Sequence, residues 1–147
     1  HHDKGEYDRA VRDYGEAVRL DPDDADAYYN RGLAHHDKAE YEQAVRDYDE
    51  AIRLSPDDPE AYASRCWSYG LMHRGEEALR DCDESLRLRP DDAATFDSRA
   101  LAYWLIGKHD EARADLEQAR ELDPLYLASL TCQLGDSWQV LRWTGAR

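Results

Sequence analysis

Arginine and aspartate recur along this sequence at a fixed spacing that two kinds of chemistry could use. Three arginines are each followed sixteen residues later by an aspartate. The arginines are Arg31, Arg65 and Arg99, the aspartates are Asp47, Asp81 and Asp115, and Asp13 fills the same aspartate slot upstream. A row of arginines can grip carboxylates or phosphates, because each guanidinium offers a planar fork of donors. Since every arginine here comes with its own acid, we favour a ladder of ion pairs that joins one helix to the next.

Cysteine and histidine could hold a metal ion, but their spacing does not favour one. The three cysteines are Cys66, Cys82 and Cys132, and no two of them form a CxxC pair. We therefore expect reduced cysteines packed in the core, where free cysteine is commonly buried, and neither a disulfide nor a zinc framework. The HHDK phrase of residues 1–4 recurs at residues 35–38. Because it is repeated sequence with no further ligand at zinc spacing, we predict no metal site.

Acidic residues are abundant, yet their arrangement predicts neither a cofactor nor an enzyme. The runs at residues 21–26 and 57–58 lack the alternating ligands and the glycine bend of a divalent-ion loop. The sequence shows neither a Ser/His/Asp order nor a glycine loop that cradles phosphates. We interpret the acids as solvated turns and helix starts, and we predict no catalysis.

The bulk composition excludes several classes of partner. The 147 residues carry a net charge of −14, which repels nucleic-acid phosphates and anionic membranes. No apolar run approaches the roughly 18 residues of a membrane span. In the absence of a basic-then-apolar leader, we expect a cytoplasmic protein. Lysine occurs only at Lys4, Lys38 and Lys108 among 19 basic residues, a bias that suggests a high-GC bacterial gene.

Regularly spaced prolines mark the ends of the structural units that must position the arginines, aspartates and cysteines. Pro22, Pro56, Pro90 and Pro124 lie 34 residues apart, and the phrases around the first two, VRLDPDDADAYYNRG and IRLSPDDPEAYASRC, align. A period of this length predicts stacked supersecondary units. The residue before a proline is biased away from helical geometry, so a helix ends there. The acids after each proline then begin the next helix, where the helix dipole favours them.

Each unit contains two amphipathic helices with a shared packing pattern. In the unit of residues 23–56, the packing residues are Tyr28, Gly32 and His35 in the first helix and Ala44, Tyr48 and Ala51 in the second. Spacings of four and three residues place each set on one face of its helix. The small residues let two helices approach closely, while the aromatic side chain fills the groove between them.

This pattern resembles the tetratricopeptide repeat, whose helix–turn–helix unit carries small and aromatic residues at these slots and a closing proline. His35 replaces the second aromatic of the first complete unit. In the next unit Cys66 replaces the small glycine, and Gly75, taken as the turn glycine, lies two residues late compared with Gly5 and Gly107. The resemblance implies an all-α fold, a right-handed α-solenoid of antiparallel helix hairpins.

The repeat phase divides the chain into five segments. These are residues 1–22, the second half of a truncated unit; residues 23–56, 57–90 and 91–124, three full units; and residues 125–147, a capping helix and tail. The capping helix repeats the packing spacing at Leu130, Leu134 and Trp138. Such caps shield the apolar face of a terminal repeat. The N-terminal end has no cap, so we expect upstream repeats or self-association there.

The resemblance also implies a concave groove lined by the remaining face of each first helix. The implied partner-binding residues are Tyr29, Asn30, Leu33, His36, Ser64, Trp67, Leu71, Asp97, Ser98, Leu101, Trp104 and Leu105. Five of them form an apolar cluster, namely Trp67, Leu71, Leu101, Trp104 and Leu105. Contiguous exposed apolar patches usually mark binding sites, and tryptophan is a favoured anchor. The alternative is that the cluster fills gaps between repeats or lies under residues 138–143.

One subfamily of these repeats grips the C-terminal carboxylate of chaperone partners with lysines, asparagines and an arginine. Asn30 matches one of those slots. Glu60, Ala63 and Ser64 occupy neighbouring slots where cations would be needed. We therefore do not expect a clamp for chaperone tails.

These features predict a protein–protein interaction module that holds a peptide or protein segment in its groove, in a scaffold or adaptor role. Basic groups on the partner would complement the acidic surface and speed the encounter. Two alternatives remain open. The chain could be a regulatory or substrate-recruiting arm of a larger enzyme or signalling protein, or a self-assembling scaffold.

Overall fold

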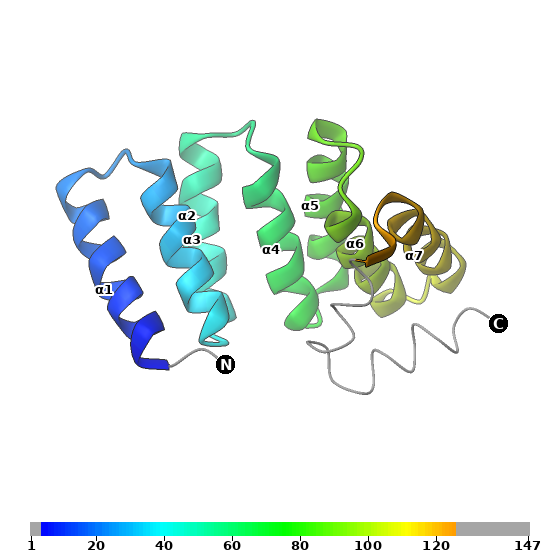
Figure 1. Ribbon diagram of the computed structural model, residues 1–147, viewed down its shortest axis with the longest axis horizontal. Helices are drawn as coiled ribbons and strands as arrows, with labels where there is room; N and C mark the ends of the chain where they lie inside the picture. Colours follow the sequence, from blue (N-terminus) through cyan, green and yellow to red (C-terminus); the bar gives the residue numbers. More distant parts are fainter. Residues whose placement is uncertain (1–3, 126–147) are drawn as a thin grey trace.

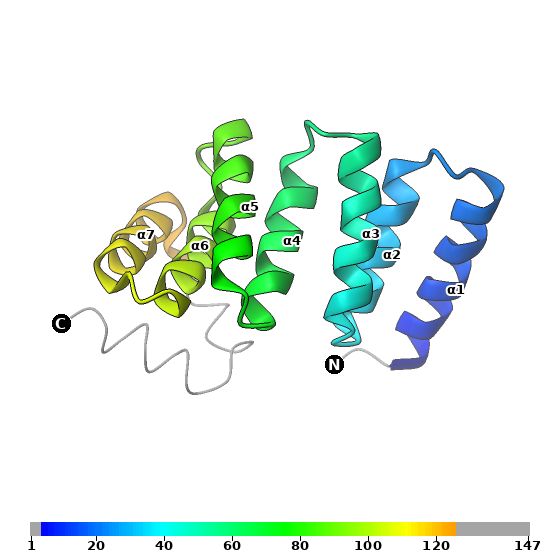
Figure 2. The same cartoon turned by 180° about the vertical axis from the view of Figure 1, so that it is seen from behind.

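The computed structural model describes residues 4–125, which form a row of antiparallel helices without a strand (Figure 1). The helices are α1 (Lys4–Leu20), α2 (Ala25–Asp37), α3 (Tyr41–Leu54), α4 (Pro59–Leu71), α5 (Gly75–Leu88), α6 (Ala93–Leu105) and α7 (His109–Leu122). Seen from either side, they follow one another along the longest axis (Figure 2). The predicted all-α helical repeat fold is confirmed. The expected capping helix lies outside the described residues, apart from its first position at Leu125.

The hairpins are α2–α3, α4–α5 and α6–α7, and neighbouring hairpins pack through α3 against α4 and α5 against α6. α1 packs on α2 at one end of the row. Each first helix also contacts the next first helix, so that α4 touches both α2 and α6. None of the helices between residues 4 and 125 is long and apolar enough to cross a membrane.

Aspartate starts the first helix of every hairpin, two residues after a proline. The caps are Asp24, Asp58 and Asp92, whose carboxylates accept backbone N–H groups at 3.2, 3.0 and 3.3 Å. Such capping satisfies donors that a helix N-terminus leaves without a partner. The helices α1, α3, α5 and α7 each end two residues before a proline. This is the predicted position, because the residue before a proline disfavours helical geometry.

A left-handed residue makes the turn inside each hairpin. The three turn residues are Ala39, His73 and Gly107, with φ of 61°, 60° and 83°. The interpretation of Gly75 as a late turn glycine is therefore wrong, because Gly75 is the first residue of α5. A Cβ atom there would lie 2.9 Å from Leu105 Cβ and 2.9 Å from Ile106 Cγ2. Glycine at this position lets α6 pack against the start of α5.

The two helices of each hairpin meet where a first-helix residue faces the residue sixteen positions later. The facing pairs are Gly32 with Tyr48, Cys66 with Cys82, and Ala100 with Leu116. A Cβ atom on Gly32 would lie 2.6 Å from Tyr48 Cε1. Only glycine therefore leaves room for the tyrosine ring. In the other two hairpins the second-helix residue is smaller than tyrosine, so the first helix carries cysteine or alanine in place of glycine.

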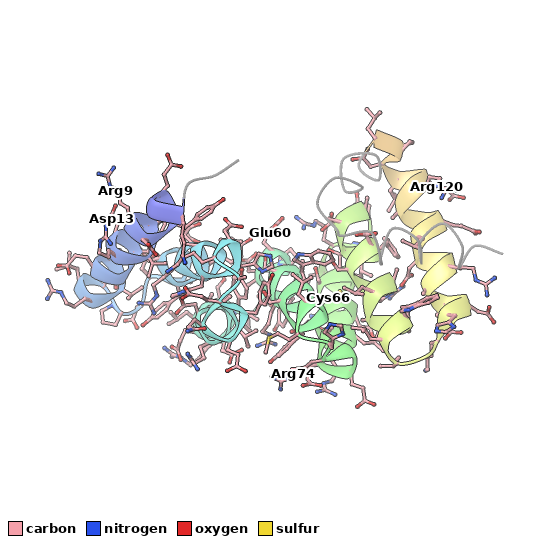
Figure 3. All side chains as sticks on the ribbon, turned by 90° about the horizontal axis from the view of Figure 1, so that it is seen from below. Arg9, Asp13, Glu60, Cys66, Arg74 and Arg120 are labelled. Atoms are coloured by element: carbon pink, nitrogen blue, oxygen red, sulfur yellow. A yellow bond between two sulfur atoms is a disulfide. The ribbon has the colours of Figure 1, made fainter. Side chains whose placement is uncertain are left out.

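Cys66 and Cys82 form a disulfide between α4 and α5, so the prediction of reduced cysteines is wrong for this pair. Their Cα atoms are 5.5 Å apart, within the range that a disulfide requires. Both side chains are fully buried, and Figure 3 shows Cys66 on α4 inside the stack. The CxxC criterion missed the pair because it tests only local spacing, whereas the hairpin joins residues sixteen apart. Cys132 lies outside the described residues.

The arginine–aspartate ladder is confirmed within each hairpin. Arg31, Arg65 and Arg99 each donate two bonds of 2.6–2.9 Å to the aspartate sixteen residues later. Those aspartates, Asp47, Asp81 and Asp115, are each 5% exposed. The upstream slot, Asp13, is exposed on α1 at the outer end of the row (Figure 3).

The ladder also has a second arm that the sequence analysis did not predict. Arg65 donates to Asp49 at 2.7 Å and Arg99 donates to Asp83 at 3.0 Å, both on the preceding hairpin. The corresponding slot in α1 holds Gly15. Because each of these guanidinium groups binds two carboxylates of the stack, the arginine row serves the fold and does not form an anion grip.

The two arms should differ in energy because they differ in burial. The Asp81 side chain is 7% exposed and the Asp83 side chain is 53% exposed. Burial raises the pKa of Asp81, and the bonds from Arg65 oppose that rise. We expect Asp81→Ala to lower the free energy of unfolding by about 3–5 kcal/mol, because it leaves a half-buried guanidinium without its main partner. Asp83→Ala, the matched control, should cost about 1 kcal/mol or less. Urea denaturation followed by circular dichroism measures both, and equal losses would contradict this account.

The disulfide predicts a change in thiol count and in stability. Denatured protein that has not been reduced should show two fewer reactive thiols than reduced protein. Reduction should lower the free energy of unfolding by about 3 kcal/mol, the value typical of a loop this short. A Cys66→Ala/Cys82→Leu variant, which copies the Ala100–Leu116 pair, should fold and lose its sensitivity to reductant. Identical thiol counts before and after reduction would show that the bond is not formed.

Candidate functional site

A cavity of about 250 Å³ lies where α2, α4 and α6 come together. It is lined by Leu33 and His36 of α2, Tyr48 of α3, Glu60, Ala63, Ser64 and Trp67 of α4, and Asp92, Ala94, Thr95 and Ser98 at the start of α6. The three first helices reach this cavity because they run in the same direction along one side of the row (Figure 1). Side chains from successive hairpins therefore share one site.

The structure brings five of the predicted groove residues together in this cavity. They are Leu33, His36, Ser64, Trp67 and Ser98. Tyr29 lies beside them, since its hydroxyl is 3.1 Å from Ser64 Oγ. These residues come from three hairpins, so the groove face that the family resemblance implied contains a real hollow.

The C-terminal half of the predicted apolar cluster contacts other parts of the stack. Leu101 packs on Gly70, where a Cβ atom would lie 2.9 Å from Leu101 Cδ2. Leu105 packs on Gly75 in the same way. Trp104 packs against the core of the α6–α7 hairpin, and its ring stacks on His109 with centroids 4.0 Å apart. These three side chains therefore fill gaps within and between the hairpins, as the alternative interpretation of the cluster described.

The remaining predicted residues do not line the cavity. Asn30 and Leu71 are half-buried, and Asp97 is only 1% exposed. The other alternative for the cluster, cover by residues 138–143, lies outside the described residues.

Tyr48 forms a buried wall of the cavity that the sequence analysis assigned only to the core. Its side chain is fully buried, and its hydroxyl interacts with the Ser68 side chain. Burial raises the pKa of Tyr48, so the hydroxyl stays protonated. Nearby, Ser68 Oγ lies 2.9 Å from His36 Nδ1. Burial lowers the pKa of His36, so its ring is neutral at pH 7.

The cavity is acidic at the end where α4 and α6 begin. Arg89, at the end of α5, binds Glu60 through Nη1 and Asp92 through Nη2, the latter at 2.8 Å. Asp92 also accepts a bond of 2.6 Å from Thr95 Oγ1. Two carboxylates therefore share one guanidinium, and the neutral His36 adds no positive charge. We call Glu60, Arg89 and Asp92 the acidic rim.

The lining is suited to binding and does not resemble a centre for metal chemistry. Within the described residues, no group of histidine, cysteine or carboxylate side chains is placed to hold a metal ion. The cavity offers apolar contact from Leu33 and Trp67, hydroxyl groups from serine, threonine and tyrosine, and a net negative rim. A small cavity of this kind fits one side chain better than a whole cofactor.

Three models of one repeat family match the sequence. A TPR repeat model matches residues 1–39, and tetratricopeptide repeat models match residues 25–58 and 94–124. The matched segments together cover more than half of the chain. No curated protein sequence matches it.

Solved structures with the same architecture are similar to this chain over most of its length. The second TPR domain of the human RPAP3 protein, in complex with HSP70 peptide SGPTIEEVD, is 28% identical with a TM-score of 0.63, and the match covers 66% of this chain and 81% of that chain. A MamA protein is 26% identical with a TM-score of 0.73, over 80% of this chain and 64% of that chain. A MamA fragment from Desulfovibrio magneticus RS-1 is 23% identical with a TM-score of 0.77, over 82% and 68%. The repeat models, these folds and the 34-residue hairpins agree, and the chain belongs to the tetratricopeptide repeat family.

Proposed function

We propose that this chain is a protein-binding module that seats a peptide or protein segment in the groove along α2, α4 and α6. The observation that carries the proposal is the cavity beside Trp67, to which three successive hairpins contribute. Stacked repeats create extended concave surfaces of this kind, and proteins built from them use those surfaces for binding. A tryptophan that lines such a hollow is a favoured anchor for a partner.

The solved relatives support the same class of function. The second RPAP3 domain is in complex with the HSP70 peptide SGPTIEEVD, and the first TPR of Spaghetti (RPAP3) is bound to the HSP90 peptide SRMEEVD. Repeats of this family are typically interaction modules without catalysis, and we propose a scaffold or adaptor role in which the bound segment carries basic groups. The acidic rim argues against acidic chaperone tails as ligands here, because Glu60 would repel them.

The compartment is a separate part of the proposal. We expected the cytoplasm, but the buried bond between Cys66 and Cys82 supports an oxidising compartment, since structural disulfides are rare where thiols are kept reduced.

The groove assignment can be tested with a random-peptide display library selected on the wild-type chain. Selected peptides should lose roughly tenfold or more in affinity for Trp67→Ala, as expected for a tryptophan anchor. Tyr62→Ala is the matched control, because Tyr62 is a half-buried aromatic of the same helix that contacts the ladder arginine Arg65 and does not line the cavity. Calorimetry measures the affinities, and circular dichroism confirms that both variants fold. Failure to select any peptide, or equal affinity for both variants, would reject the groove as the binding site.

A further inference from the structure

We propose that His36 binds a backbone carbonyl oxygen of the segment seated in the groove, through a ring N–H that a buried hydrogen-bond chain fixes at Nε2. The inference rests on the proposed function of the groove, and it names the chemical group of the partner that this part of the groove recognises. Three observations carry it: the position of His36 in the cavity, the hydroxyl groups bonded to its ring, and the lack of a partner for Nε2.

His36 connects the cavity with the interior of the stack. It lies on α2 and lines the cavity, and its Nδ1 lies 2.9 Å from Ser68 Oγ on α4. Ser68 is fully buried. The Tyr48 hydroxyl of α3 interacts with the same serine and has no other partner within residues 4–125. Three helices therefore contribute to one chain of polar groups, which runs from Tyr48 through Ser68 to His36.

The buried hydroxyl groups determine the direction of this chain. Burial raises the pKa of Tyr48, so its hydroxyl keeps its hydrogen, and Ser68 Oγ is the acceptor within reach. A serine hydroxyl that accepts one bond still has its own hydrogen to donate, and His36 Nδ1 can accept it. In the opposite direction, Ser68 would donate to Tyr48 and leave the Tyr48 hydrogen buried without an acceptor, which is costly. Tyr48 therefore donates to Ser68, and Ser68 donates to His36 Nδ1.

This direction sets the tautomer of His36. Burial lowers the pKa of His36 and outweighs the nearby charge of Asp37, so the ring is neutral at pH 7. The Tyr41 ring packs edge to face against it, with centroids 5.2 Å apart. A neutral imidazole that accepts a bond at one nitrogen carries its hydrogen on the other. With Ser68 at Nδ1, the hydrogen lies on Nε2.

The Nε2–H group is available to a ligand. Nε2 makes no hydrogen bond within residues 4–125, and it is not among the fully buried atoms that lack one. Two hydroxyl groups of the same lining are already engaged, since Thr95 donates to Asp92 and Ser98 donates to the Ala94 carbonyl. The ring of His36 therefore offers the cavity a donor that the fold holds in place and does not use.

The lining favours a neutral acceptor for this donor. Glu60 and Asp92 line the same cavity, and none of the described lining residues is a lysine or an arginine. A ligand carboxylate would therefore enter beside like charge, which is unfavourable. Backbone carbonyl groups are neutral acceptors that every peptide carries, and they need a donor once they leave water. A carbonyl of a segment that packs on Trp67 meets this need at His36.

The first test needs no ligand. Long-range ¹H–¹⁵N spectra of the intact chain at neutral pH distinguish a ring nitrogen that carries hydrogen from one that accepts a bond. We expect the hydrogen of His36 on Nε2. Ser68→Ala should move both ring nitrogens toward the shifts of an exposed histidine. Ser98→Ala is the matched control, because Ser98 lines the cavity but bonds its own helix, and it should leave the His36 signals unchanged.

The second test titrates the intact chain with four probes: N-methylacetamide, acetamide, methyl acetate and acetate. They share one acetyl carbonyl and differ in its charge and its strength as an acceptor. We expect N-methylacetamide, which copies a backbone unit, to shift the His36 ring signals in a saturable way. Acetamide and methyl acetate should bind more weakly, and acetate should not bind.

Two variants of His36 test the position of the donor, with binding followed at the indole N–H of Trp67. His36→Gln should keep most of the response, because the glutamine amide nitrogen reaches about as far from the main chain as Nε2. His36→Asn, whose amide nitrogen reaches only as far as Nδ1, should weaken N-methylacetamide by about fivefold, the effect of one neutral hydrogen bond. Circular dichroism confirms that both variants fold.

The outcomes separate this inference from the proposed function. A hydrogen on Nδ1, or His36 signals that Ser68→Ala leaves unchanged, would overturn the buried chain. No response to N-methylacetamide, or equal binding to the glutamine and asparagine variants, would overturn the carbonyl site. Preference for acetate would identify an anion site and preference for acetamide a side-chain amide, and either would overturn the inference. Displayed peptides that need Trp67 but tolerate His36→Asn would leave the groove function intact and reject His36 as the donor.

Discussion

Every hairpin in this chain depends on one register, in which a first-helix residue faces the residue sixteen positions later. Two adjacent rows use it. One row holds the buried ion pair, as in Arg65 with Asp81, and the next row holds the close packing contact, as in Cys66 with Cys82. Sliding one helix along the other would break both rows together. The ion pair requires a particular geometry, and the packing contact requires side chains of particular sizes. A register shifted by one residue or by one turn would satisfy neither.

The cavity is a consequence of that register. Gly32 leaves space for the Tyr48 ring, and Tyr48 in turn lines the cavity. The ladder arginines bind carboxylates of the stack, and no lysine or arginine is among the described residues that line the cavity. Arg89 binds two of the lining carboxylates. The fold fixes the position of the lining residues and leaves their chemistry to the sequence.

Much of the fold could be predicted from the sequence, because the 34-residue period repeats both the helix ends and the packing faces. The errors have physical causes. Gly75 looked like a turn glycine by residue type, whereas Ala39 and His73 adopt the left-handed conformation that glycine usually supplies. Cys66 and Cys82 both occupy packing positions of the repeat, but the cysteines were judged by CxxC spacing alone. In the groove, helical periodicity shows which residues share one face of a helix. It does not show which other helices that face contacts. Trp67 lines the cavity, whereas Leu101, on an equivalent face one repeat later, packs on the preceding hairpin.

The second arm of the ladder bears on how the stack comes apart. Stability in repeat proteins is a sum of terms within each repeat and terms between neighbours. The bonds from Arg65 to Asp49 and from Arg99 to Asp83 add to the neighbour terms, so α2 through α7 should open as one cooperative unit. The joint between α1 and α2 has glycine at the matching position, and α1 has no buried residue. Amide hydrogens should therefore exchange fastest in α1 and much more slowly from α2 onward. The stack would then open first at α1, before the other helices open together.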